Sequence, residues 1–326
     1  MSKLFKAIGR TAGVLGAAAL TGAAAQRVCA LLDKRKLKDA YGWKIEVQGR
    51  RMCVKVSGSG KETVVLLPGA GEASPAMVYQ PLAELLGAHY TTVTVEYFGY
   101  GLSDPAPSPR TVENVAEELH ELLHKLGLGK YILAAHSYSG IIAMEYLSRY
   151  GEEVSALVGI DMTVPKLIDY ADISGINLRM EKSVRRLKSV GLLRLVSKIK
   201  PDWITAPIDP ERYSQEEMEL YRRLCLNNGD TDDMLQELLL ADDALTQRRD
   251  EKLPGALPVL QFLSTDSAEM LEDFGGEADT WYELHEELTE NPHSETVILE
   301  GGHYLQCTHP EEIAEKFHTW YGAVGR

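Results

Sequence analysis

The chain has 326 residues, 44% hydrophobic and 25% charged, a balance typical of a globular protein with a full hydrophobic core. Its 48 Asp and Glu outnumber its 34 Lys and Arg, giving a formal net charge of −14. This charge argues against a nucleic-acid partner, because binding phosphates requires a surplus of basic side chains. Cys29, Cys53, Cys225 and Cys307 lie far apart and form no CxxC pair, so neither a disulfide framework nor a structural metal is indicated.

Residues 1–40 differ in composition from the rest and are considered separately. An Ala, Gly and Leu-rich stretch at 11–25 is flanked on both sides by basic residues. Three interpretations are open: a cleaved signal peptide, a single-pass membrane anchor over about residues 8–32, and an amphipathic helix on the domain or at a membrane surface. We favour the anchor, although it must tolerate Gln26 and Arg27; otherwise the protein is expected to be secreted or cytoplasmic.

From residue 42 onward, short β-branched runs alternate with stretches of helical periodicity, as is typical of a largely parallel sheet covered by helices. Strands are expected at 43–47, 52–56, 63–67, 91–96, 131–135, 156–160, 259–263 and 296–299, with the first two forming an antiparallel hairpin. Helices are expected at 76–86, 112–126, 139–150 and 310–321.

One long segment interrupts this alternation. Between residues 161 and 258 the sequence is rich in Leu, Arg, Lys and Glu at helical spacing and has no convincing strand pattern. Prolines at 201, 207 and 210 and a turn at 227–230 divide it. The pattern therefore predicts an insertion of several helices.

Ser137 follows the strand expected at 131–135 and precedes an apolar-periodic helix. A nucleophile on a sharp strand-to-helix turn needs small residues two positions to either side, and Ala135 and Ser139 meet that requirement, with Gly140 allowing a further close approach. The helix that begins here would direct its N-terminal dipole at the serine oxygen. The alternative is a serine in an ordinary strand-to-helix turn.

Three further stretches accompany this serine in chain order. Residues 64–71 (VVLLPGAG) form a buried strand ending in a glycine turn, residues 96–104 (EYFGYGLSD) follow the next strand, and residues 299–305 (LEGGHYL) precede the last helix. From about residue 42 onward the chain resembles the α/β-hydrolase superfamily, in its serine-nucleophile branch with a helical cap. The resemblance implies an α/β-hydrolase fold, with a mostly parallel eight-stranded sheet covered by helices. The core would comprise residues 41–162 and 258–326, and the helical cap residues 163–257.

The same resemblance implies roles for individual residues. Ser137 would be the nucleophile, and His303 would take its proton and return it to the leaving group. The backbone N–H groups of Ala70 and Tyr138 would form the oxyanion hole. The loop at 96–104 is interpreted as structural. His136 should point away from the reaction and is assigned no chemistry.

Two carboxylates compete for the place of the triad acid. The family order of serine, acid and histidine favours Asp266, which stands just after the strand expected at 259–263. It would accept the Nδ1–H of His303. Asp161 is the alternative, since in some members the acid follows the strand after the nucleophile helix. Without a catalytic role, Asp266 would be an exposed turn residue and Asp161 a cap.

A competing motif lies in the helix expected at 112–126. His120, Glu121 and His124 satisfy H-E-x-x-H, a zinc-binding pattern, and Glu145 is at a plausible distance for a third ligand. The apolar stripe of this helix leaves both histidines beside its polar face. A zinc hydrolase is therefore a remote alternative.

The expected reaction is acyl transfer to water through an acyl-enzyme on Ser137. A carboxylic-ester hydrolase is favoured, with an aminopeptidase or carbon–carbon-bond hydrolase also open, while the serine argues against relatives that use an aspartate nucleophile. The expected partner is a small-molecule ester or amide, with possible membrane association through residues 1–40. No cofactor is implied. From another class, a non-catalytic ligand-binding protein on the same fold is the main alternative.

Overall fold

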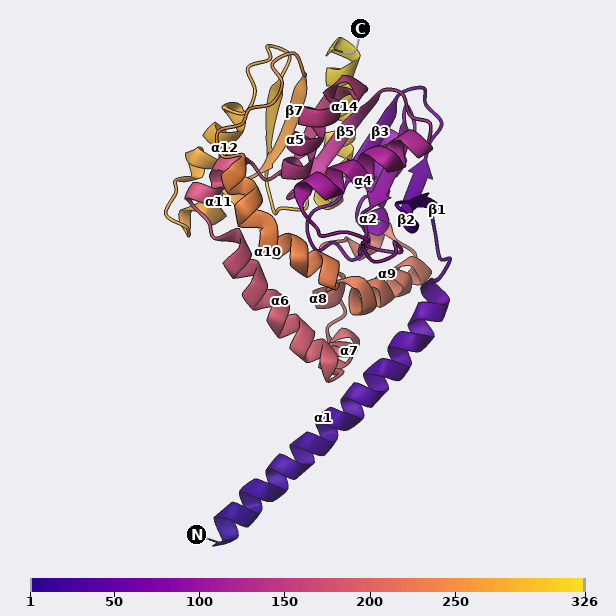
Figure 1. The fold of residues 1–326 in the computed structure, drawn as a ribbon, viewed down its shortest axis with the longest axis vertical. Coiled ribbons are helices and arrows are strands. Elements are labelled where there is room, and N and C mark those ends of the chain that lie inside the picture. The colour runs from indigo at the N-terminus through magenta and orange to yellow at the C-terminus, as the bar shows by residue number, and fades with distance from the viewer. Residues whose placement is uncertain (1, 325–326) are drawn as a thin grey trace.

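The computed structural model describes the backbone of residues 2–324 (Figure 1). Side chains are described for residues 19–324 except 173, 176, 177 and 179–181 of one helix.

Eight strands form one sheet in the order β1-β2-β4-β3-β5-β6-β7-β8. The strands are β1 (Trp43–Val47), β2 (Arg50–Ser57), β3 (Thr63–Leu67), β4 (Thr91–Glu96), β5 (Tyr131–His136), β6 (Val154–Ile160), β7 (Val259–Ser264) and β8 (Glu295–Leu299). The β1–β2 and β2–β4 pairs are antiparallel, and all other pairs are parallel. The predicted eight-stranded, mostly parallel sheet is confirmed.

The helices surround this sheet or extend from it. They are α1 (Ser2–Leu37), α2 (Pro75–Val78), α3 (Gln80–Leu86), α4 (Val112–Lys125), α5 (Ser139–Tyr150), α6 (Ile173–Ser189), α7 (Leu192–Ile199), α8 (Asp202–Thr205), α9 (Gln215–Asn228), α10 (Asp232–Gln247), α11 (Thr265–Glu272), α12 (Ala278–Glu286), α13 (Leu305–Thr308) and α14 (Pro310–Val324). The helix expected at 76–86 is divided into α2 and α3, and α11 and α12 were not predicted.

Two hydrophobic cores hold the helices on opposite faces of the sheet. One joins α4 and α5 to alternate strand residues such as Val65 and Leu133. The other joins α3 and α14 to the intervening residues, such as Leu66 and Ile132. Because successive side chains of a strand point to opposite faces, strands β3 and β5 contribute to both cores and are buried on both sides. This explains their continuous apolar runs.

Helices α6 to α10 lie between β6 and β7, two strands that are neighbours in the sheet. Figure 1 shows these helices grouped at one end of the sheet, with α1 running past them. In the described part of the chain, no helix combines the length and apolar content needed to cross a membrane. The expectation of a spanning anchor at residues 8–32 therefore finds no support.

A buried ionic network fastens this helical insertion to the sheet. The guanidinium of Arg110 donates to Glu118 of α4 at 2.6 Å and to Glu237 of α10 at 3.0 Å. Tyr100 donates to the second oxygen of Glu237. All three charged side chains are essentially inaccessible to solvent. Burial raises the pKa of both carboxyls, against the opposing influence of Arg110.

Arg110→Ala leaves two buried carboxylates without a counter-charge and should lower the free energy of unfolding by about 3–5 kcal/mol. Without Arg110 the folded-state pKa of Glu118 and Glu237 rises further above the unfolded value, so stability is lost as pH increases. The deficit should therefore be larger at about pH 8 than at about pH 5. Urea unfolding at both pH values measures it, with the exposed Arg50→Ala as control. A deficit independent of pH would contradict this account.

Candidate active site

Ser137 lies immediately after β5, with its backbone in the left-handed region at φ 53°. Non-glycine residues rarely adopt this conformation, and where they do the surrounding structure must enforce it. The carbonyl of Ser137 accepts hydrogen bonds from Gly140 at 2.9 Å and from Thr163 at 2.8 Å, while its N–H donates to Ile160 at 3.3 Å. These bonds hold a sharp turn at the carboxyl end of the sheet, with the serine side chain partly accessible.

The small residues around Ser137 are required by close packing. A Cβ on Gly140 would lie 2.4 Å from the carbonyl oxygen of Thr163, and one on Gly69 would lie 3.0 Å from the Cβ of Ser137. Ser139 is fully buried, and its hydroxyl lies 2.5 Å from the carbonyl of Pro68 and 3.0 Å from the Tyr97 hydroxyl. The glycine turn after β3 is thus pressed against the serine turn after β5.

The expected oxyanion donors flank this contact. Ala70 follows Gly69 on the β3 turn, and Tyr138 follows Ser137 at the start of α5. In the described part of the chain, neither backbone N–H donates to a protein acceptor. Both donors therefore remain available for a ligand oxygen.

His303 lies on the loop after β8, and its Nδ1 is 2.7 Å from Oδ2 of Asp161. Asp161 is completely buried at the end of β6 and has a left-handed φ of 44°. Its Oδ1 accepts the Ser264 N–H at 2.8 Å, and its Oδ2 accepts the hydroxyls of Ser264 and Ser267. The histidine side chain is 37% exposed.

Burial alone raises the pKa of the Asp161 carboxyl, but hydrogen bonds from His303, Ser264 and Ser267 outweigh burial and hold the pKa below its ordinary value of 3.8. The carboxylate is therefore ionised at neutral pH. Its stabilising contribution is lost as pH falls through this lowered pKa. Ionised and facing Nδ1, Asp161 can orient the ring and stabilise the imidazolium form of His303.

The expectation that Asp266 would accept the His303 Nδ1–H bond is wrong, because Asp161 occupies that position. Asp266 lies in the first turn of α11 with an exposed side chain. Its contribution to the histidine loop is from the backbone: its N–H donates to the carbonyl of Gly301 at 3.1 Å. Thr265 accepts the Gly301 N–H at 3.0 Å, so the start of α11 holds the loop in place.

A second buried pair lies beneath the serine turn and was not predicted. Nδ1 of His136 is 2.7 Å from Glu72, and its Nε2 is 3.0 Å from the carbonyl of His303. Glu72 also accepts the Gly69 N–H at 2.8 Å. Both ring nitrogens of His136 are therefore within hydrogen-bonding distance of protein oxygens. His136 thus points away from the side of the turn where Ser137 would react, as expected. Through Glu72 and the His303 carbonyl it connects the turn at Ser137 to the glycine turn after β3 and to the loop that carries His303.

The loop at 96–104 is held by its own internal contacts. Glu96 is buried and accepts the Leu102 N–H at 2.6 Å and the Tyr41 hydroxyl at 2.7 Å. A Cβ on Gly101 would lie 2.0 Å from the Glu96 carboxylate, which explains the glycine. These contacts agree with the structural role expected for the loop.

The residues of the H-E-x-x-H pattern have other partners. His120 stacks on Tyr150 with ring centroids 3.8 Å apart, and Glu121 pairs with Lys125 at 2.6 Å. Glu145 forms ion pairs with Arg149 and Arg248, so it is not free to act as a third ligand. Within the described residues, no group of three or more His, Cys, Asp or Glu is placed to hold a metal. The zinc alternative finds no support in this geometry.

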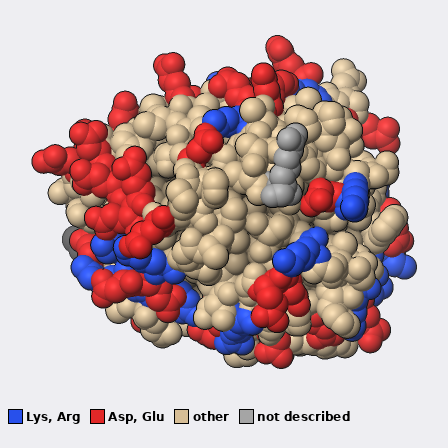
Figure 2. Space-filling model, turned by 90° about the horizontal axis from the view of Figure 1, so that it is seen from above, with Lys and Arg blue, Asp and Glu red and all other residues tan. Residues whose placement is uncertain are grey.

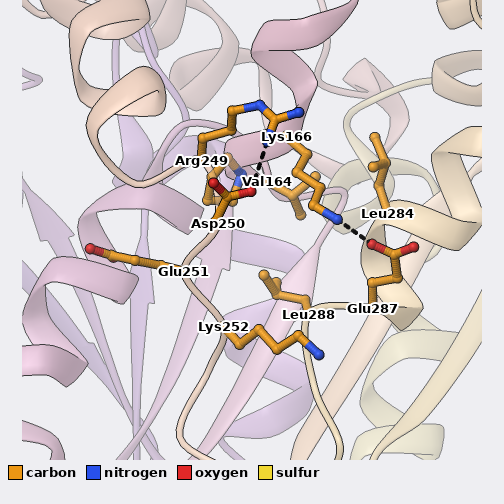
Figure 3. A pocket seen from close by; sticks show the side chains of 10 residues that line it. Val164, Lys166, Arg249, Asp250, Glu251, Lys252, Leu284, Glu287 and Leu288 are labelled. Atoms are coloured by element: carbon orange, nitrogen blue, oxygen red, sulfur yellow. Dashed lines mark hydrogen bonds and ion pairs between the residues drawn. The ribbon is translucent and has the colours of Figure 1, made fainter.

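A hollow of about 240 Å³ lies away from these residues, between the end of α10 and α12 (Figure 3). Its charged side chains are paired, with Lys166 2.5 Å from Glu287 and Arg249 2.7 Å from Asp250. Since neither Ser137 nor His303 lines it, this hollow is not part of the candidate active site.

Comparison with known proteins identifies the family. The model of the alpha/beta hydrolase family matches residues 64–316. The chain belongs to this family. It is 29% identical over 225 residues to the uncharacterized protein YbdG of Bacillus subtilis, covering 67% of each chain.

Similarity to relatives of named activity is more limited. The chain is 30% identical over 110 residues to the 2-(acetamidomethylene)succinate hydrolase of Mesorhizobium japonicum, covering 34% of this chain and 38% of that one. The esterase of Thermogutta terrifontis has the same fold, with a TM-score of 0.60 and 18% identity over 87% of this chain and 99% of that one. The chain thus spans about two thirds of the YbdG protein, but little more than a third of the named hydrolase.

If Asp161 orients His303, Asp161→Asn should lower kcat/KM for an ester substrate by about 10⁴-fold, because the amide favours the wrong histidine tautomer. Asp266→Asn should stay within about threefold of wild type, since substitutions of exposed side chains have small effects. Steady-state kinetics on both purified variants decides between them. A near-normal Asp161→Asn enzyme, or an inactive but folded Asp266→Asn enzyme, would reverse the assignment.

Glu72→Gln removes the charge that His136 faces while keeping the side chain's shape. We expect the free energy of unfolding to fall by about 1–3 kcal/mol, because the buried carboxylate that His136 and the Gly69 N–H contact is replaced by an amide, which is a weaker acceptor. Urea denaturation followed by circular dichroism measures the change, and Glu84→Gln, at an exposed position of α3, is the matched control. Equal stability of the two variants would show that the Glu72–His136 pair contributes little.

Proposed function

We propose that the protein is a serine hydrolase that cleaves a carboxylic ester through an acyl-enzyme on Ser137. The observation that carries this proposal is the 2.7 Å contact between His303 Nδ1 and the buried Asp161. It supplies a histidine of fixed tautomer at the end of the sheet where Ser137 stands in its strained turn. The His303 ring lies 4.7 Å, between centroids, from that of His136, the residue before the serine.

In the proposed mechanism His303 accepts the proton of the Ser137 hydroxyl as the oxygen attacks the substrate carbonyl. The oxyanion that forms is held by the backbone N–H groups of Ala70 and Tyr138, close to the start of α5. His303 then gives the proton to the leaving alcohol. In the second half, His303 activates water, which releases the acid and restores the Ser137 hydroxyl.

The choice of an ester bond is based on the chemistry of the triad, and the selection of the substrate is assigned to a different part of the chain. The triad and two oxyanion donors serve ester and amide cleavage alike, and an ester requires less leaving-group assistance, which makes it our first choice. An amide or carbon–carbon bond remains the second choice; the related 2-(acetamidomethylene)succinate hydrolase is named for a hydrolytic activity. We propose that residues 163–257 act as the cap that selects the substrate, since they lie between β6 and β7.

Ser137→Ala should lower the rate of p-nitrophenyl ester hydrolysis by roughly 10⁴-fold or more, because the acyl-enzyme can no longer form. The variant should also lose labelling by a fluorophosphonate probe, while Ser59→Ala, at an exposed loop position, keeps both activities. Esters of varied chain length and aminoacyl-naphthylamides would define the substrate class. A folded wild-type protein that is neither labelled nor active on any of them would favour the ligand-binding alternative.

A further inference from the structure

Over residues 22–33, helix α1 contacts the rest of the protein through polar and small residues, while Leu37 at its end joins a hydrophobic core. Asp33 is 4% exposed and lies 2.7 Å from Arg194 of α7, and Gln26 accepts from Arg194 at 2.6 Å. Gly22 approaches the turn between α6 and α7 so closely that a Cβ would lie 2.1 Å from the carbonyl oxygen of Val190. The face of α1 that would ordinarily meet solvent is therefore the face that is docked.

On the opposite face of the described part of α1, four apolar side chains are exposed. Leu20, Val28, Leu31 and Leu32 are 75%, 58%, 66% and 53% exposed, and we call them the outward stripe of α1. A surface helix of a globular protein normally turns its apolar stripe toward the core. Here the orientation is reversed, which indicates that this stripe contacts an apolar partner outside the chain.

A second apolar stripe lies on the neighbouring helices α7 and α8. Leu192, Leu195 and Ile199 are 45%, 54% and 69% exposed and follow helical spacing, and Trp203 of α8 is 74% exposed. We call these four the outward stripe of α7–α8. Since Arg194 of α7 binds α1, the two stripes belong to adjacent helices at one end of the molecule.

The charges of the protein are divided between this end and the rest. Residues 2–37 and 173–200 contain fifteen of the 34 Lys and Arg but two of the 48 Asp and Glu. Exposed basic side chains beside the two stripes include Arg27, Lys34, Arg35, Lys198 and Lys200. At the opposite end, seen in Figure 2, acidic residues predominate among the charged ones. A protein of net charge −14 thus has an excess of basic residues in these two segments, although Arg185 and Lys188 are paired with Asp232 and Asp230.

We propose that the outward stripes of α1 and α7–α8 dock the protein on an anionic lipid surface. Helices that lie in a membrane interface combine Leu and Trp on one side with Lys and Arg beside them, as these helices do. Basic side chains contact the headgroups, while Trp203 is suited to the boundary between headgroups and acyl chains. The helices would lie in the plane of the interface without crossing the bilayer.

A second copy of the chain is a less suitable partner for the same surface. Pairing two copies through it would bring the basic residues of both copies together, which the Coulomb repulsion between like charges opposes. An anionic bilayer instead supplies both the apolar contact and the opposite charge. The acidic remainder of the protein would be repelled from that bilayer, so docking would occur in one orientation.

Flotation of the full-length protein with large unilamellar vesicles tests the proposal. We expect binding to vesicles of phosphatidylcholine with about 30% phosphatidylglycerol, and much weaker binding to phosphatidylcholine alone. Trp203→Ser should weaken binding to the anionic vesicles by about tenfold, because it removes one large apolar contact. Trp43→Ser is the matched control, since Trp43 is 64% exposed on β1 and belongs to neither stripe.

Lys34→Gln and Arg35→Gln should each weaken binding by about fivefold on anionic vesicles and have little effect on neutral ones. Circular dichroism and urea midpoints equal to wild type would show that each variant is folded. Absence of vesicle binding by the wild-type protein would overturn the proposal, as would equal losses for Trp203→Ser and Trp43→Ser. A concentration-dependent dimer that Trp203→Ser abolishes would assign the surface to a second copy instead. None of these measurements depends on hydrolytic activity.

Discussion

The left-handed backbone at Ser137 is the constraint on which the arrangement of the site depends. It persists because the ends of β3, β5 and β6 meet there: the carbonyl of Ser137 is bonded by Thr163, and Gly69 packs against its side chain. Strain of this kind requires surroundings that determine the conformation completely. The glycines, the buried Ser139 and the Glu72–His136 pair are therefore parts of one tightly packed junction.

Much of this fold could be predicted because strands that are buried on both faces of a sheet consist mainly of apolar residues. Strands β3, β5, β6 and β7 are predominantly apolar, since each strand lies inside a sheet covered on two sides. The small residues around Ser137 and the glycines before His303 likewise follow from backbone geometry that larger side chains would prevent. Local sequence therefore identified the turns where Ser137 and His303 stand.

The carboxylate that faces His303 could not be predicted in the same way. Asp161 and Asp266 each follow a strand that ends at the same edge of the sheet. Which of the two carboxylates contacts His303 depends on the local backbone. Asp161 has a left-handed φ, and its carboxylate lies against His303. Asp266 lies at the start of α11, where its side chain is exposed to solvent. Glu72 was missed for a related reason: its partner His136 is 64 residues away, and neither position shows a motif.

In the N-terminal segment, composition and tertiary contacts favour different arrangements. Counting apolar residues makes 8–32 resemble a spanning segment, in which Gln26 would be an imperfection. In the folded protein Gln26 and Asp33 help to attach α1, because Arg194 of α7 donates a hydrogen bond to Gln26 and forms an ion pair with Asp33. The apolar residues between them are consequently turned outward. The hydrogen bond and the ion pair that fix α1 to the protein therefore leave its apolar side chains exposed, and they place these side chains beside α7.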